Sequence, residues 1–216
     1  MKSLLTATLL FITGSCYADS FRLPFTGTWF VAQGGDTPNV NHHMQVRSQA
    51  YGIDFAKVGG AGGRSLNSGT GGDTKDYFAW GEAVLAPTAG TIVAAENSQP
   101  DNAIGVHDTE HVLGNHVVLK TTDGAFVFLA HFQKGSIRVS VGAKVQEGDT
   151  LGKCGNSGNS DFPHIHMHVQ NSADFTNGLG QNIIFSRINV ELSGKKFDRV
   201  DWRLIRGLFI SNSTGI

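Results

Sequence analysis

Residues 163–169 read PHIHMHV. In a β-strand successive side chains point to opposite faces, so His164, His166 and His168 would share one face and three apolar side chains the other. Neighbouring imidazoles on one face can share a metal ion, or divide into a metal ligand and a proton-transfer group. The stretch therefore predicts a strand with one core face and one chemical face.

Short apolar or alternating runs bounded by Gly, Asn, Asp and Ser recur along the rest of the chain, which is typical of strands joined by turns. We expect strands at 28–32, 51–56, 82–86, 90–95, 116–120, 125–131, 144–145, 150–153 and 164–169. Helical periodicity over ten or more residues is absent before the C-terminal third, where 200–208 fits either a strand or a short helix. The fold class predicted is mainly β.

The composition excludes several classes of protein. The 216 residues contain 17 Lys and Arg against 18 Asp and Glu, and 40% are hydrophobic. This hydrophobic fraction is too high for a disordered chain and too low for a multi-span membrane protein. The sequence has no long run of basic residues that could bind a phosphate backbone, so we expect no nucleic-acid partner.

The first 18 residues resemble a secretory signal peptide. Lys2 precedes a short apolar run at 4–12, and small residues end at Ala18, where cleavage would leave Asp19 first. The apolar run is shorter than the roughly 20 residues that cross a bilayer, so we expect no membrane span. We therefore expect export to the periplasm or the exterior, and one domain over 19–216.

Two features have two interpretations each. Cys154 is the only cysteine after cleavage, and is either a small buried residue or a nucleophile. The glycine-rich stretch 59–73 predicts a mobile loop, which either borders a cleft or is a tolerated surface insertion.

Two further residues extend the candidate site. Asp54 lies in the otherwise apolar run 50–56, and a buried carboxylate needs a metal, a cation or several hydrogen-bond donors. His131 ends the apolar strand expected at 125–131. Both residue types suit metal binding or proton transfer.

The order of several segments resembles the lysostaphin-type (LytM-type, β-lytic) zinc metallopeptidases. The matching segments are YGIDFA (51–56), VLAPTAGTIV (84–93), GNHVVL (114–119), LAHF (129–132), VQEGD (145–149), GNSG (155–158) and PHIH (163–166). The resemblance covers about 50 to 170, within a core of about 41–170, and leaves 171–216 as an extension that either completes the sheet or forms a contact surface.

This resemblance implies a single antiparallel β-sheet or sandwich-like metallopeptidase domain with a groove and long loops. The groove holds one zinc ion, and typical members hydrolyse peptide bonds of bacterial peptidoglycan. By position, Asp54 and His166 would be zinc ligands. His131 and His164 would handle protons and stabilise the transition state.

One position departs from the family pattern His-x-Gly-x-Asp, because its first residue here is Ala50. A catalytic zinc generally has three protein ligands and water. A branch of the family has a histidine further upstream, followed by Gln-x-Tyr, and this resemblance points to His43 as the third ligand with His42 in reserve. The remaining alternative is a site with no third protein ligand.

The other histidines have competing interpretations. His107 and His111 either lie in a solvated loop or share a metal on a helix, and His116 is either structural or in contact with substrate. His168 is either hydrogen-bonded to a ligand imidazole or on the outside of the strand.

The function that we expect is that of a secreted zinc-dependent metalloendopeptidase acting on peptidoglycan peptides. One alternative is a catalytically silent wall-binding or hydrolase-regulating protein on the same fold. This alternative is suggested by Ala50, which replaces the usual first zinc ligand. Another is a zinc peptidase that attacks proteins or a competitor's wall. The oligomeric state stays open.

Overall fold

A computed structural model describes residues 20–213, and the expected signal peptide at 1–18 lies outside the described residues. Regular structure is almost entirely strand, with two short 3-10 helices, η1 (His42–Gln45) and η2 (Thr74–Asp76). The mainly β fold class is therefore confirmed. Among residues 20–213 no helix has the length and apolar character needed to cross a membrane.

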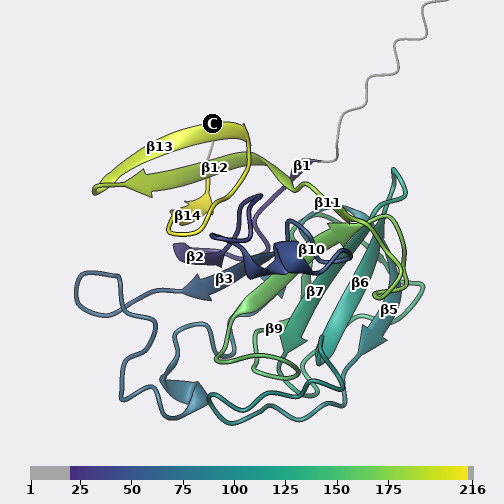
Figure 1. Ribbon diagram of the computed structural model, residues 1–216, viewed down its shortest axis with the longest axis horizontal. Coiled ribbons are helices and arrows are strands. Elements are labelled where there is room, and N and C mark those ends of the chain that lie inside the picture. The colour runs from purple at the N-terminus through teal and green to yellow at the C-terminus, as the bar shows by residue number, and fades with distance from the viewer. Residues whose placement is uncertain (1–19, 214–216) are drawn as a thin grey trace, which may run out of the picture.

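Twelve strands form one large sheet (Figure 1). Its order is β1 (Ser20–Phe21), β12 (Ile184–Leu192), β14 (Phe209–Asn212), β2 (Trp29–Gln33), β3 (Ile53–Lys57), β10 (Ile165–Gln170), β7 (Phe126–Phe132), β6 (Asn115–Thr121), β5 (Gly90–Glu96) and β8 (Lys144–Val145). β11 (Gly180–Gln181) pairs with β10, and β13 (Lys195–Trp202) pairs with β12. A separate pair joins β4 (Ala83–Leu85) to β9 (Thr150–Lys153).

The pairing within residues 20–213 is antiparallel throughout except for the parallel contact of β1 with β12. Each of the nine strands expected between 28 and 169 matches an observed strand to within two residues at either end. The segment 200–208 follows neither alternative for its whole length, because β13 ends at Trp202 and no helix or strand follows before β14. The extension completes the sheet through β12 and β14.

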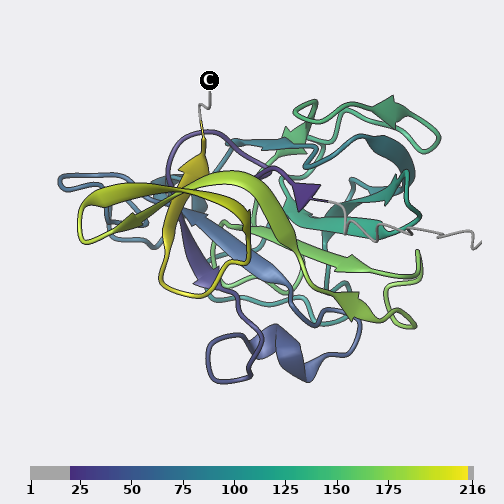
Figure 2. The same ribbon diagram turned by 90° about the horizontal axis from the view of Figure 1, so that it is seen from above.

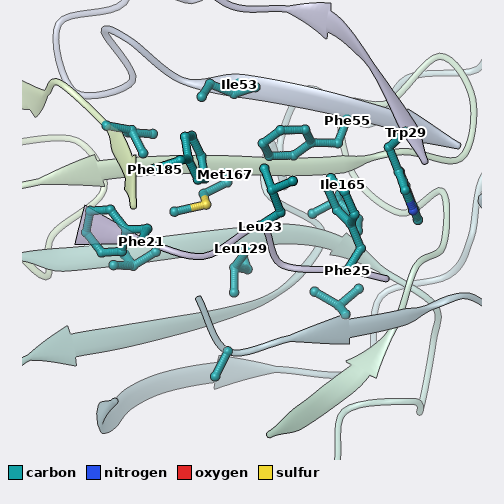
Figure 3. Close-up of a cluster of buried hydrophobic side chains, with 14 of the residues drawn as sticks. Phe21, Leu23, Phe25, Trp29, Ile53, Phe55, Leu129, Ile165, Met167 and Phe185 are labelled. Carbon is teal, nitrogen blue, oxygen red and sulfur yellow. The ribbon is translucent and has the colours of Figure 1, made fainter. Parts of the chain in front are cut away.

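One face of the central strands packs on the main hydrophobic core (Figure 3). Ile165 and Met167 of β10 lie there beside Phe55 of β3, and all three are buried. Phe25 stacks on Trp29 with ring centroids 4.6 Å apart, and fills the core from the N-terminal segment. Each such side chain contributes about 1.5–3 kcal/mol when fully buried, so this face fixes which side of β10 turns away from the core.

Every residue of β10 is buried, on both faces of the strand. A second, smaller apolar cluster that includes Leu113, Val118 and Phe128 lies on the face opposite the main core. Strand alternation sends the apolar residues of β10 into the main core, and sends His166 and His168 to the opposite face. The chemical face expected from the sequence is thus present, but it is covered rather than open along its whole length.

The β12–β13 hairpin lies at one end of the molecule (Figure 2). Almost every residue of β13 is exposed, and Val200 and Trp202 are among the exposed large apolar side chains. The hairpin extends the sheet beyond the part that the core stabilises.

Candidate functional site

Asp54 and His166 are brought together by strand pairing. They lie opposite one another in the antiparallel register of β3 with β10, and Oδ1 of Asp54 is 2.9 Å from Nδ1 of His166. Their strand neighbours Ile53, Phe55 and Ile165 belong to the core, so alternation turns both polar side chains to the opposite face. Two sequence-distant residues therefore meet without help from a loop.

His43 reaches the same carboxylate from the 3-10 helix η1. Its Nε2 is 3.0 Å from both carboxylate oxygens of Asp54, and its side chain is buried. The buried Asn41 begins this helix, because its Oδ1 accepts a hydrogen bond from the backbone N–H of His43. The Nδ2 of Asn41 donates to the carbonyl of Gly52, two residues before Asp54.

Gly52 lets the rings pack closely. A Cβ at this position would lie 3.2 Å from Cε1 of His166 and 3.3 Å from Cγ of His43, as well as 2.9 Å from the carbonyl oxygen of Gln49. A side chain here would therefore push the two imidazoles out of place.

His164 lies on the other side of Asp54. Its Nε2 is 3.6 Å from Oδ1 of Asp54, while its Nδ1 donates to the carbonyl of Phe162 at 2.8 Å. The hydroxyl of Ser160 lies 3.2 Å from the same Nδ1. These contacts fix the ring so that Nε2 is the nitrogen directed into the site.

His131 faces the site because the backbone of β7 is irregular there. Simple alternation would send His131 into the core with Leu129, yet it is Phe132 that enters the core. His131 adopts a φ of 65°, in the left-handed region that non-glycine residues rarely occupy, and the β6–β7 ladder shifts register at this point. Backbone strain at this one residue therefore turns the imidazole toward the site.

The His131 ring is held by the 155–160 loop. Its Nδ1 donates to the carbonyl of Ser157 at 2.8 Å, and its ring centroid is 4.7 Å from that of His164. Gly158 lets this loop lie directly on the backbone of Gly114, because a Cβ at Gly158 would come within 2.4 Å of the Gly114 nitrogen. The carbonyl of Ser157 is thereby kept in place.

His168 contacts the ring nitrogen of His166 that does not face Asp54. Its Nδ1 is 2.9 Å from Nε2 of His166, and its ring stacks on Phe128 with centroids 4.5 Å apart. It is fully buried, which excludes the outer strand position. Its Nε2 is a buried nitrogen without a hydrogen-bond partner among residues 20–213.

Burial and mutual proximity shift the pKa values of these groups. Burial disfavours the charged form of Asp54, but the neighbouring His43, His164 and His166 outweigh it and hold the pKa of the carboxyl well below its ordinary value. Burial, followed by His43, lowers the pKa of His166 to about 4. Burial, followed by His164, holds the pKa of His131 well below its ordinary value. At pH 7 the ionised carboxylate of Asp54 thus lies beside the neutral rings of His131 and His166.

His164 differs from these histidines in the sign of its shift. Burial lowers its pKa, but Asp54 outweighs burial through its charge and a hydrogen bond, so the pKa of His164 is raised. The site therefore contains imidazoles whose pKa values move apart, an arrangement found where protons are exchanged.

These side chains line a groove of about 480 Å³. The residues expected from the sequence contribute His42, His43, Asp54, His131, His164 and His166, and the others are Val46, Gln49, His107, Val112, Leu113, Asn159, Asp161 and Phe175. Gln49, Asn159, Asp161 and Phe175 were not predicted as groove residues, because they come from loops with no periodic pattern to mark them.

Ala50 stands at the position where the family pattern has a histidine. Ala50 is not among the groove residues, and its carbonyl oxygen would lie 2.4 Å from a Cβ at Gly180 in β11. Candidate ligand atoms of His42, His43 and Asp54 all lie within 4.8 Å of one another. His42 is exposed, whereas His43 is buried against the carboxylate.

The other candidate histidines are held separately. His107 is paired with Asp161, and His111 with Asp108, both in an exposed loop, so His107 and His111 do not share a ligand position. His107 nevertheless lines the groove, which the solvated-loop interpretation did not anticipate.

Three further candidates lie away from the groove. His116 is partly buried, with its Nδ1 donating to the carbonyl of Gly114, which fits the structural interpretation. Cys154 is buried in the main core. The 59–73 loop contributes no residue to the groove, and its Arg64 contacts Glu191 and Phe209 instead.

Comparison with known proteins gives the following relatives. Residues 73–178 match the family model described as Peptidase family M23, a segment that includes His131, His164 and His166 but not His43 or Asp54. An 88-residue stretch is 34% identical to Endolysin 2638A of Staphylococcus phage 2638A, covering 40% of this chain and 16% of that protein. The chain thus spans only a small part of this relative.

Two solved structures are also similar. One is an alanine-to-histidine mutant of the catalytic domain of the prophage-encoded M23 protein EnpA from Enterococcus faecalis, 21% identical, with a TM-score of 0.47 over 75% of this chain and 94% of that one. The other is the catalytic domain of the antimicrobial peptidase lysostaphin from Staphylococcus simulans, 19% identical, with a TM-score of 0.42 over 72% of this chain and 88% of that one.

Proposed function

Because the chain belongs to peptidase family M23 through the segment 73–178, we propose that it is an exported zinc-dependent metalloendopeptidase that cleaves peptide bonds of bacterial peptidoglycan. The observation that carries this proposal is the convergence of His43, His164 and His166 on Asp54 in the floor of a groove. We further propose that residues 19–216 form one domain, since strands from both ends of the described chain enter the same sheet.

The residues suit a zinc ion. Two imidazole nitrogens and a carboxylate oxygen are donors that zinc prefers, and tetrahedral bonds of about 2.0–2.2 Å place ligand atoms about 3.3 Å apart. The nitrogens of His43 and His166 lie 3.0 and 2.9 Å from Asp54, and both distances are close to this spacing. We assign His43, Asp54 and His166 as the protein ligands. His43 replaces the histidine ligand of the family pattern, because Ala50 at that position has no donor atom.

A bound zinc ion would lower the pKa of a water molecule to about 7 and polarise the scissile carbonyl. His131 is suited to accept a proton at Nε2, because its Nδ1 is engaged by the Ser157 carbonyl. His164 likewise has only Nε2 directed into the site, and its raised pKa suits a group that holds a proton and donates a hydrogen bond to developing negative charge.

This pair of histidines favours an enzyme over a silent wall-binding or regulatory protein. A purely structural or adhesive site has no chemical need for two oriented imidazoles beside the ligand set. The strained backbone at His131 is also a cost that stability alone does not explain.

The test is digestion of purified peptidoglycan by the zinc-loaded protein, with new amino termini identified by mass spectrometry and His164→Ala run in parallel. New termini from the wild type alone would support the proposal and identify the bond. The absence of release from walls of several cross-link types would instead favour the silent wall-binding function, and cleavage of a protein substrate but not of walls would favour a general peptidase.

A further inference from the structure

The groove has two chemically different ends along β10. Asp161 and His164 precede the first residue of β10, whereas His166 and His168 lie within the strand, so Asp161 belongs to the loop that enters β10 and His168 lies further along it. Phe175 lies at the His168 end, with ring centroids 6.0 Å apart. The proposed ligands therefore lie between an end with a carboxylate and an end with an aromatic ring.

The carboxylate of Asp161 has no cationic Lys or Arg near it in the groove. The residues that line the groove include neither of these types, and Asp54 is the only other acidic residue among them. The side chain of Asp161 is 69% exposed, so it is open to a ligand that occupies the groove.

Asp161 is nevertheless held in place. One of its oxygens is 2.9 Å from Nε2 of His107, whose Nδ1 is 2.9 Å from Oδ1 of Asn159. Its backbone carbonyl accepts a hydrogen bond from the N–H of Gly105. The second carboxylate oxygen accepts no hydrogen bond from any residue between 20 and 213, so it is available to a donor on the ligand.

We propose that Asp161 is a specificity-determining residue that selects peptides carrying a free amino group close to the scissile bond. This inference rests on the proposed function. An amine bound in the groove would donate to the free oxygen of Asp161, while the scissile peptide bond would lie against His164 and Asp54. Because the carboxylate is largely exposed, the discrimination is modest, about 3- to 10-fold in kcat/KM.

The experiment compares purified peptidoglycan with its free amino groups intact and the same material after acetylation. Wild type, Asp161→Asn and Asp161→Glu are measured on both substrates. Asp123→Asn is the matched control, because it removes one negative charge from an exposed turn outside the groove. We expect the wild type and Asp123→Asn to prefer the unacetylated wall, Asp161→Asn to lose that preference, and Asp161→Glu to retain part of it.

Equal slowing of Asp161→Asn on both substrates, or an unchanged preference, would overturn the inference. Binding of soluble muropeptides, intact and acetylated, is measured by calorimetry on the same four proteins. If neither wall is cleaved, the proposed function fails, and the binding data still decide the inference. Weaker binding of acetylated muropeptides by wild type but not by Asp161→Asn would support it, and equal or undetectable binding by both proteins would refute it.

Discussion

Asp54 and His166 face each other across the β3–β10 ladder, with Oδ1 2.9 Å from Nδ1. The sheet itself fixes this pair, since both residues lie within paired strands. The third proposed ligand, His43, depends instead on a four-residue 3-10 helix that begins at Asn41. The site thus combines a rigid pair with one residue whose position is held by local hydrogen bonds.

Replacing His43 by alanine should weaken zinc binding by more than roughly 100-fold, beyond what loss of an outer-shell partner costs. Replacing the exposed His42 should change zinc affinity only slightly. Competition with a chromophoric chelator measures both, with circular dichroism to check folding. An equal loss in the two variants would show that His42 also belongs to the ligand set.

Removal of either proton-transfer candidate should separate binding from turnover. His131→Ala and His164→Ala should keep stoichiometric zinc and lose on the order of 10²- to 10⁴-fold in kcat, as loss of a general acid or base does. His111→Ala, in an exposed loop outside the groove, is the matched control. Full turnover by either of the first two variants would remove that histidine from the mechanism.

His168→Phe tests the support behind His166. Phenylalanine can keep the stacking on Phe128 but removes the nitrogen that lies 2.9 Å from His166, so zinc affinity should fall about 10- to 100-fold. The unfolding midpoint of the metal-free protein should not fall, because the variant also removes a buried nitrogen without a partner. A drop in stability with unchanged zinc affinity would mean that His168 is only a packing residue.

The metal-free protein should lose stability on acidification from pH 7.5 to 5. The pKa values of His131, His166 and His168 are lowered in the folded state, so the unfolded chain binds more protons below about pH 6.5. The His166 value of about 4 corresponds by itself to about 2 kcal/mol at pH 5. The raised pKa of His164 acts in the opposite direction and offsets part of this loss.

Urea unfolding in the presence of a chelator measures this effect. The stability of His168→Phe should depend less on pH than that of the wild type over the same range. A midpoint that rises on acidification would show that the raised pKa of His164 dominates the sum.

Cys154 should be chemically inert in the native protein. Burial, with further contributions from Glu82 and Asp101, raises the pKa of its thiol well above the ordinary value, so the thiolate is scarce at pH 8. Ellman's reagent should modify it only at the rate of unfolding, and Cys154→Ala should retain full peptidase activity. Rapid labelling with loss of activity would revive the nucleophile hypothesis.

The strands between 28 and 169 were predictable because each alternates or runs apolar between turn residues. The same alternation places Asp54, His164 and His166 on one face, so most of the proposed site follows from the sequence pattern and the family resemblance. The β12–β13 hairpin was not recognised as a hairpin, since nearly all of β13 is exposed and burial imposes no pattern on it.

Other parts of the site depend on backbone detail that a sequence pattern does not encode. Alternation alone would have sent His131 into the core, and only the positive φ at that residue reverses it. The position of His43 depends on the hydrogen bonds of Asn41, and Asp161 lies in an irregular loop. Such features are decided by tertiary contacts rather than by local periodicity.

The two-sided burial of β10 couples the groove to the global fold. This strand is paired along both edges, with β3 and β7, and is covered on both faces. Its backbone amides therefore exchange with solvent only when most of the molecule opens. Partial loosening of the outer hairpin would leave the proposed metal ligands in place, so the centre of the groove outlasts the periphery under denaturing stress.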